Sequence, residues 1–267
     1  MSHTPHILVV VSTASEIPLK EGGTHETGIF LGELTEPAEA MHEAGFKLTF
    51  ASPGGKEPII DKHSYDLIYW GFSKKRVNRA KAFYETLLQQ GLTHPLVLEE
   101  LAEQPGQLAQ FDGLFVPGGH APMVDLLHRN HLEDDALNER MGRLLKFFHD
   151  SQRPTGLICH APAVLAAAPK VDGKWIYEGY RMTTVTMVSE FLLEDTPLMK
   201  VVPGHLKKYP TQVLKEAGAI LEQTNIPMRA KVVEDRELIT GQDPYSAEHF
   251  GKRFVEKVNT FVKSQKA

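Results

Sequence analysis

The stretch TGLICHAPAVLAAA, residues 155–168, joins an apolar run to an alanine-rich run through a cysteine. Cys159 is the only cysteine of the chain, and His160 follows it directly. This pattern is typical of a strand, a sharp turn and a helix. Unpaired N–H groups at the start of a helix favour an anion, which predicts a lowered pKa for the Cys159 thiol. The alternative is a small, inert core cysteine.

Apolar runs rich in β-formers alternate with helical patterns along the rest of the chain. Strands are expected at residues 6–12, 46–52, 114–116, 153–159 and 237–240, and helices at residues 28–44, 133–150 and 246–262. The strands lack clean alternation and are separated by helices, which predicts an α/β fold with a parallel sheet covered on both faces. Ligands bind beyond the carboxyl ends of such strands, so we expect residues that follow the strands to form the site.

Residues 53–105 break this rhythm. They contain a helical pattern at residues 77–88, and no sheet strand is expected among them. No linker rich in proline, glycine or serine divides the chain. We therefore expect a single domain over residues 1–267 with a cap-like insertion at about residues 53–105.

The composition argues against several classes of protein. The net charge of −5 is spread over 267 residues without a dense basic tract, which gives no indication of a nucleic-acid partner. No apolar run approaches the roughly 20 residues of a membrane span. A single cysteine cannot form an intramolecular disulfide, and no positive region precedes the first apolar run. The expected location is the cytoplasm, without membrane association.

Cys159 is the candidate nucleophile, and His160 is the candidate group that takes or gives its proton. Glu33 is a candidate carboxyl partner, because its helix could pack beside the turn at Cys159. The alternative, a carboxylate that faces solvent, is favoured from the residues alone, because three more glutamates crowd the same helix: Glu36, Glu39 and Glu43.

Gly118 and Gly119 follow another expected strand and precede His120. Their backbone N–H groups could stabilise a developing oxyanion, and His120 could help to bind the substrate. The alternative is an ordinary turn, which Pro117 and two glycines encode without any function. A Gly-Gly pair and a Cys-His pair at the ends of two strands are together a stronger indication of a site than either pair alone.

Metal and nucleotide cofactors are not indicated. Four histidines invite a metal hypothesis, namely His25, His42, His120 and His205. None of them pairs with another at the His-x-x-x-His spacing on a shared helix, and there is no second cysteine. The chain also contains no dinucleotide-binding or phosphate-loop glycine motif and no Gly-x-Ser-x-Gly elbow. We therefore expect neither a metal nor a cofactor.

The ordered motifs resemble the DJ-1/PfpI superfamily, and within it the Hsp31/HchA-like branch. The resemblance rests on the sequences VPGGH at residues 116–120, ICHAPA at residues 158–163, TG and Glu33 with Pro37 at residues 27–37, PGHL at residues 203–206 and ELITGQDP at residues 237–244. It spans nearly the whole chain. It implies a flavodoxin-like sandwich, a homodimer, and Cys159, His160 and Glu33 as catalytic residues.

The resemblance also implies an activity. Enzymes of this branch act as glutathione-independent glyoxalases, which convert methylglyoxal to lactate without a cofactor. A thiolate of Cys159 would form a hemithioacetal, Glu33 or His160 would move a proton through an enediol, and hydrolysis would release lactate. Deglycation of protein adducts and a holding chaperone activity are related expectations for stress defence.

Two positions depart from the family pattern. Relatives carry an aspartate near residues 186–190; here Met187 stands about where that acid is expected, and Glu190 is the nearest carboxylate. A Cys-His-Asp triad is therefore not expected. Some relatives bind zinc through histidines and a glutamate. His42 is retained, but Lys47 and Thr49 follow it, so that zinc site is also not expected.

Two competing hypotheses remain from the sequence. One is an amidase-, peptidase- or amidotransferase-like hydrolase that uses the same thiol. A late His-x-Glu dyad would support it, but Glu248 and His249 occur in the reverse order. The other is a chaperone or redox sensor whose Cys159 is oxidised.

Overall fold

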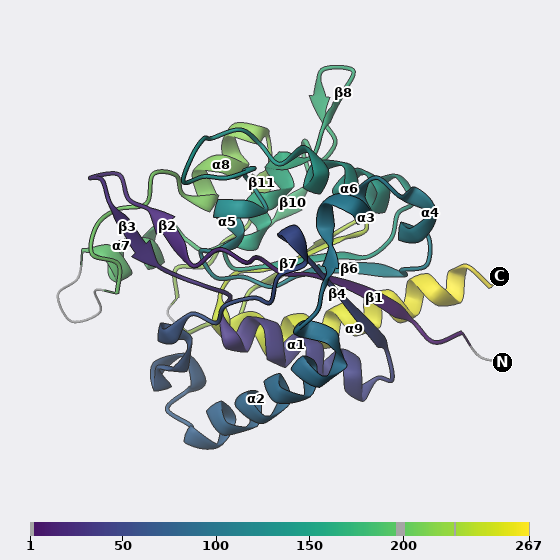
Figure 1. Cartoon of the computed structure of the whole chain (residues 1–267), viewed down its shortest axis with the longest axis horizontal. Helices are drawn as coiled ribbons and strands as arrows, with labels where there is room; N and C mark the ends of the chain where they lie inside the picture. Colours follow the sequence, from purple (N-terminus) through teal and green to yellow (C-terminus); the bar gives the residue numbers. More distant parts are fainter. Residues whose placement is uncertain (1–2, 196–200, 227, 267) are drawn as a thin grey trace.

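The computed structural model describes residues 3–195, 201–226 and 228–266. Within these residues the largest sheet has the strand order β12-β13-β7-β6-β1-β4-β5 (Figure 1). Its strands are β1 (His6–Val10), β4 (Lys47–Ser52), β5 (Leu96–Val97), β6 (Gly113–Val116), β7 (Thr155–Ile158), β12 (Val232–Asp235) and β13 (Leu238–Gly241). All neighbours are parallel except β12 and β13, which are antiparallel. The expected α/β fold class is confirmed.

The sheet separates two hydrophobic cores because strand side chains alternate between its faces. Leu8 and Val10 of β1 belong to one core, and Ile7 and Val9 belong to the other. The helices that cover the first core are α3 (Leu98–Ala102), α6 (Glu139–Asp150), the 3₁₀ helix η5 (Ala161–Ala167) and α8 (Pro210–Ala217). The second core is covered by α1 (Leu31–Glu43) and α9 (Ala247–Ser264), which lie together below the sheet in Figure 1.

Shorter elements connect these layers. The additional strand pairs are β2 (Glu16–Pro18) with β3 (Thr24–Glu26), β8 (Lys170–Val171) with β9 (Lys174–Trp175), and β10 (Arg181–Met182) with β11 (Ile220–Leu221). The remaining helices are α2 (Lys74–Leu87), α4 (Pro105–Leu108), α5 (Pro122–Asp125), α7 (Met187–Glu194), the 3₁₀ helices η1 (Pro53–Gly55), η2 (Lys62–Tyr65), η3 (Leu67–Trp70) and η6 (Pro244–Ser246), and the π-helical turn η4 (Leu88–Leu92). None of the described helices is both long enough and apolar enough to cross a membrane.

Two helices begin later than their patterns predict. The helix expected from residue 28 begins at Leu31, because the preceding residues pair with the insertion: Ile29 N–H donates to the carbonyl of Ile59 at 2.8 Å. The helix expected from residue 133 begins at Glu139. The side chain of Asn138 caps it by accepting from the N–H groups of the next turn. In both cases a backbone partner or a cap fixes the start of the helix.

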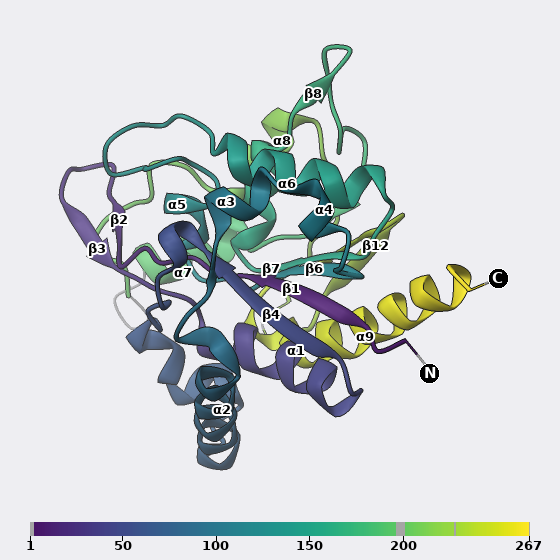
Figure 2. The same ribbon diagram turned by 45° about the vertical axis from the view of Figure 1, so that its right-hand side comes forward.

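The expectation that residues 53–105 contain no sheet strand is wrong. Leu96 and Val97 form β5, the edge strand that pairs with Ala51 and Ser52 of β4. A strand of two residues is too short to produce a hydrophobic period, which is why the sequence did not reveal it. Elsewhere in the insertion, α2 packs against α1 at the lower edge of the molecule in Figure 2, and its Phe83 and Leu87 join the second core.

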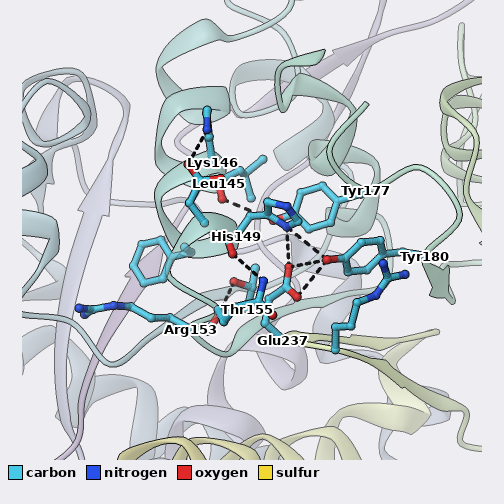
Figure 3. Close-up of polar contacts among 12 residues, drawn as sticks. Leu145, Lys146, His149, Arg153, Thr155, Tyr177, Tyr180 and Glu237 are labelled. Atoms are coloured by element: carbon cyan, nitrogen blue, oxygen red, sulfur yellow. Dashed lines mark hydrogen bonds and ion pairs between the residues drawn. The ribbon is translucent and has the colours of Figure 1, made fainter. Parts of the chain in front are cut away.

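A buried polar network lies at the start of β7, about 13 Å along the strand from Cys159. Both carboxylate oxygens of Glu237 accept from the Tyr180 hydroxyl at 3.1 Å, and one of them contacts His149 Nδ1 at 2.8 Å (Figure 3). The Arg236 guanidinium lies 3.3 Å from the centre of the Tyr180 ring. The network ties α6, β10 and β13 together at the end of the sheet that Cys159 does not occupy.

Replacing Glu237 with alanine is therefore expected to reduce the free energy of unfolding by about 3 kcal/mol, because it leaves buried donors of Tyr180 and His149 without an acceptor. Tyr180→Phe removes one donor only and is expected to cost about 1 kcal/mol. Urea unfolding midpoints measure both values. Equal stability of Glu237→Ala and wild type would contradict a stabilising role for this network.

Candidate active site

Cys159 follows β7 in a left-handed backbone conformation, with a φ of +63°. Such a conformation is unfavourable for a residue with a side chain and persists only when the surroundings hold it. Here the Cys159 N–H donates to Gly241 at 2.9 Å. Its carbonyl accepts from Val185 N–H at 3.1 Å and from the Thr184 hydroxyl at 2.5 Å. The sharp turn expected from the sequence is thus fixed by three hydrogen bonds.

Gly118 and Gly119 let two reactive groups approach each other. A Cβ on Gly118 would lie 2.3 Å from a carboxyl oxygen of Glu33 and 2.7 Å from the Cβ of Cys159. Gly119 has a φ of +102°, and a Cβ there would lie 2.3 Å from the carbonyl oxygen of Gly28. The two glycines are therefore required for space, beyond any role of their N–H groups.

Glu33 is fully buried, so the alternative of a solvent-facing carboxylate is wrong for this residue. The other three glutamates of α1 do face outward, toward Arg76 and Arg79 of α2. Burial raises the pKa of Glu33 well above its ordinary value, against the opposing effects of the Cys159 thiol and the Gly119 N–H as hydrogen-bond donors. Neither carboxyl oxygen is in an aligned hydrogen bond. This raised pKa favours the protonated form of Glu33, which can donate a proton.

His160 connects Cys159 to a carboxylate that the sequence did not assign. Its Nδ1 lies 3.2 Å from Cys159 Sγ, and its Nε2 lies 2.7 Å from Oε1 of Glu190. The second contact is short but is not aligned as a hydrogen bond. His120 packs its ring 4.2 Å from the His160 ring, with its Nε2 3.9 Å from the other Glu190 oxygen. The Cys159 thiol, the His160 imidazole and the Glu190 carboxylate thus follow one another in space within one buried cluster.

The position of Glu190 follows from helical geometry. Met187 begins α7 and is 38% exposed, whereas Glu190 lies three residues later and is buried against the two imidazoles. Thr186 caps this helix by accepting from Ser189 N–H at 3.1 Å. The sequence indicated Glu190 only as the carboxylate nearest to the expected acid, and the cap at Thr186 is a further signal because it places Glu190 in the first turn of α7.

The charges in this cluster follow from burial and mutual contact. Burial opposes ionisation of Glu190, but His160 and His120 outweigh it and hold the pKa of Glu190 at about 2. Burial lowers the pKa of His160 despite the nearby carboxylate. His120, although also buried, has its pKa raised by Glu190. At neutral pH His160 is therefore uncharged and can accept a proton at Nδ1, while its Nε2 lies 2.7 Å from an ionised Glu190.

The lowered thiol pKa expected for Cys159 is wrong. Burial raises the pKa of Cys159 well above its ordinary value, and charge on Glu33 would raise it further. The helix that follows Cys159 is only the short 3₁₀ helix η5, whose dipole does not offset the loss of solvation. When Glu33 is protonated it carries no charge, and burial is then the main cause of the raised pKa of Cys159. The thiol thus rests protonated beside a neutral base, His160.

The thiol nevertheless remains reachable. Cys159 and His160 line a cavity of about 360 Å³, together with Gly119 and His120. Among the residues that the structure describes, Gly118 is not part of the cavity wall. Much of the wall is apolar, and the side chains that supply this character include Phe30, Tyr69, Val185, Leu192, Ile226 and Met228.

The insertion contributes to this cavity. Asp61, His63, Ile68 and Tyr69 belong to the wall and lie within residues 53–105. The other acidic residue that lines the cavity is Asp243. Among the lining residues that the structure describes there is no lysine or arginine. The insertion thus supplies part of the cavity wall, including one of its acidic side chains.

The family's zinc ligands do not assemble around His42. Its ring packs against Phe83 with a centroid distance of 5.7 Å, and the Thr49 hydroxyl contacts His6. Within the described part of the chain, His42 joins no group of metal-ligating side chains. The donor atoms of His120, His160 and Glu190 do lie within 4.8 Å of one another. However, His160 already contacts both the Cys159 thiol and Glu190.

This geometry agrees with comparisons to known proteins. The sequence profile of the DJ-1/PfpI family matches residues 96–257, more than half of the chain, and the chain belongs to that family. It is 25% identical over 246 residues to protein/nucleic acid deglycase HchA of Escherichia coli O1:K1 and of strain K12. Each match covers 92% of this chain and 78% of the relative. The chain falls in the HchA-like branch.

Solved structures show the same fold. The structure of glyoxalase III from Candida albicans matches with a TM-score of 0.72 and 20% identity, over 96% of this chain and 98% of that one. The Rapid Encystment Protein 24 KDa of Francisella tularensis matches with a TM-score of 0.73 and 22% identity, over 96% and 99%. At these identities the likeness concerns the fold alone.

Proposed function

We propose that this chain is a cofactor-independent cysteine enzyme for small reactive aldehydes, which converts methylglyoxal to lactate in defence against carbonyl stress. The observation that carries the proposal is the position of the Cys159 thiol, 3.2 Å from His160 and against the buried Glu33. The names of two relatives support it, since one is a deglycase and the other a glyoxalase III.

The first step of the proposed reaction is addition of the thiol to the aldehyde. His160 Nδ1 takes the proton of Cys159 as the C–S bond forms, and the ionised Glu190 stabilises the resulting imidazolium. The aldehyde oxygen takes that proton from the His160 imidazolium, which gives a hemithioacetal and returns His160 to its neutral form. Gly119 and His120 line the same cavity as Cys159 and are the proposed groups that bind this oxygen.

The second step moves hydrogen between the two carbons. Glu33 is protonated at rest, so it first donates its proton to the ketone oxygen and then, as a carboxylate, accepts the proton of the hemithioacetal carbon. As the enediol becomes a lactoyl thioester on Cys159, Glu33 returns that proton to the former ketone carbon and takes the proton of the other hydroxyl, which restores protonated Glu33. Water then cleaves the thioester and releases lactate and the free thiol. The aldehyde carbon is oxidised and the ketone carbon is reduced, so no external oxidant or cofactor is required.

Lactate release by the purified chain tests this function. The protein is incubated with methylglyoxal without added thiols, and lactate is measured by a coupled dehydrogenase assay. Parallel reactions contain a methylglyoxal-modified peptide, a glutamine substrate and a peptide substrate. Lactate from free methylglyoxal supports the proposal. Adduct repair without that activity would instead favour a deglycase.

The hydrolase alternative receives little support from the geometry. Glu248 and His249 are exposed on α9, and Glu248 pairs with Lys252 at 2.6 Å. They do not line the cavity as described. Ammonia or peptide release at rates above lactate formation would overturn this assignment.

Glu190→Gln is expected to lower kcat/KM about 100-fold, because the imidazolium of His160 loses its counter-charge. The pH profile of the rate gives a second, directional prediction for this variant. His160 acts as a base only when neutral, so the rate falls on the acid side as it protonates. Without the Glu190 charge the pKa of His160 falls further, so the acid limb moves to lower pH.

The control for this variant is Met187→Leu on the same helix, which is expected to leave the rate and the pH profile unchanged. An acid limb that stays in place in Glu190→Gln would mean that Glu190 does not act on His160.

A further inference from the structure

A second group of histidines lies outside the cavity, in the loop between α5 and α6. The loop folds back on itself: Arg129 N–H donates to the Ala136 carbonyl at 2.7 Å, and Asn138 N–H donates to the Leu127 carbonyl at 3.0 Å. This brings three side chains together, namely His128, His131 and Asp135. One donor atom from each lies within 4.8 Å of the others.

The two imidazoles are buried without partners for their free nitrogens. His128 is 2% exposed and His131 is 3% exposed. His128 Nδ1–H donates to the Asp135 carbonyl at 2.8 Å, which leaves a lone pair on Nε2. Nε2 of His128 and both ring nitrogens of His131 have no hydrogen bond. Buried polar atoms of this kind normally have a partner.

The geometry of the group fits a shared cation. His131 Nε2 lies 3.0 Å from Oδ1 of Asp135, yet the two atoms are not aligned as a hydrogen bond. The backbone bond to His128 Nδ1 fixes its tautomer, as carbonyls do for many metal-binding histidines.

The positive charges of Lys207 and Lys208 compete with a bound cation. Lys208 Nζ lies 3.6 Å from Oδ2 of Asp135, the oxygen that does not face His131. Oδ1 therefore remains available as a ligand. The Asp135 side chain is 58% exposed, so it can adjust to a metal while the buried histidines stay in place.

We propose that His128, His131 and Asp135 form a binding site for a divalent transition metal, with zinc as the preferred ion. Two imidazoles and one carboxylate are a common zinc donor set, and the exposed side of Asp135 leaves a fourth position for water. The site lies at the far end of α5 from His120 and joins the two arms of the loop. Its role is to hold that loop, so it is independent of the proposed reaction.

Zinc titration of the full chain tests the site. Chelator-treated protein is titrated with zinc chloride by calorimetry, and its melting temperature is measured with and without zinc. Wild type is expected to bind about one equivalent and to melt at a higher temperature with zinc. Asp135→Asn, an exposed change that leaves the backbone acceptor for His128 intact, is expected to weaken binding at least about tenfold. The double variant His128→Gln/His131→Gln is expected to lose binding and the thermal shift.

Active-site variants separate this site from the cluster at the thiol. Cys159→Ala and Glu190→Gln are expected to retain the full equivalent of zinc. Cobalt bound to wild type is expected to lack a sulfur-to-metal charge-transfer band, because no thiolate takes part. Loss of zinc in Glu190→Gln, or unchanged affinity in Asp135→Asn, would overturn the proposal. So would the absence of saturable binding by wild type.

Discussion

Cys159→Ala is expected to abolish lactate formation, with a loss of about 10⁴-fold or more, because no other atom can form the covalent intermediate. Cys159→Ser is expected to be nearly as inactive, because a hydroxyl is far less acidic than a thiol and His160 is a weak base. Both replacements keep the backbone bonds to Gly241, Val185 and Thr184, so the fold is expected to persist. Circular dichroism and thermal melting check that point.

The single cysteine makes this experiment clean. A thiol-specific probe is expected to label wild type once and neither variant at all, which counts active sites independently of turnover. Substantial lactate formation by Cys159→Ala would refute the covalent mechanism. Loss of activity together with loss of the folded signal would call for Cys159→Ser as the informative variant.

Glu33→Gln is expected to lower kcat about 10²- to 10⁴-fold, because an amide has the shape of a protonated carboxyl but cannot shuttle a proton. The alkylation rate of Cys159 is expected to change little, because a neutral group replaces a neutral group. That second measurement tests the protonation state. If Glu33 were ionised at rest, its removal would lower the pKa of the thiol and speed up alkylation.

The matched control is Glu43→Gln, on the same helix but exposed and paired with Arg79. It is expected to leave both kcat and alkylation at wild-type values. A wild-type kcat in Glu33→Gln would remove Glu33 from the proposed proton path and leave His160 as the only base.

The fold could be predicted from the sequence because its strands are buried on both faces and its helices are periodic. β1, β4, β6, β7 and β13 all fall where apolar runs predict them. The edge strand β5 could not be predicted, because two residues carry no period and their partner is fixed only by the tertiary structure. The late start of α6 could not be predicted either. The residues before it fit a helical pattern equally well, and only the side-chain cap of Asn138 fixes the first turn.

The site could be predicted only where backbone geometry dictates residue type. Cys159 at a sharp turn and the Gly118-Gly119 pair carry that signal. The burial of Glu33 could not be predicted, since four glutamates share α1 and only packing selects one of them. Glu190 could be named only as the nearest carboxylate, because α7 places it one turn after the position where an acid was expected. The pKa of the thiol depends on solvation, which no local sequence pattern reports.

The insertion leaves the sheet after Ser52 and rejoins it at Leu96 and Val97, beside Ala51 and Ser52 in the register of β4 and β5. Its two stems are thus anchored at neighbouring points, and the chain between them can lengthen or change without altering the order of the strands. That same segment supplies Asp61, His63, Ile68 and Tyr69 to the cavity. Exchanging it between relatives would therefore change which small molecules the cavity admits and leave Cys159 and His160 in place.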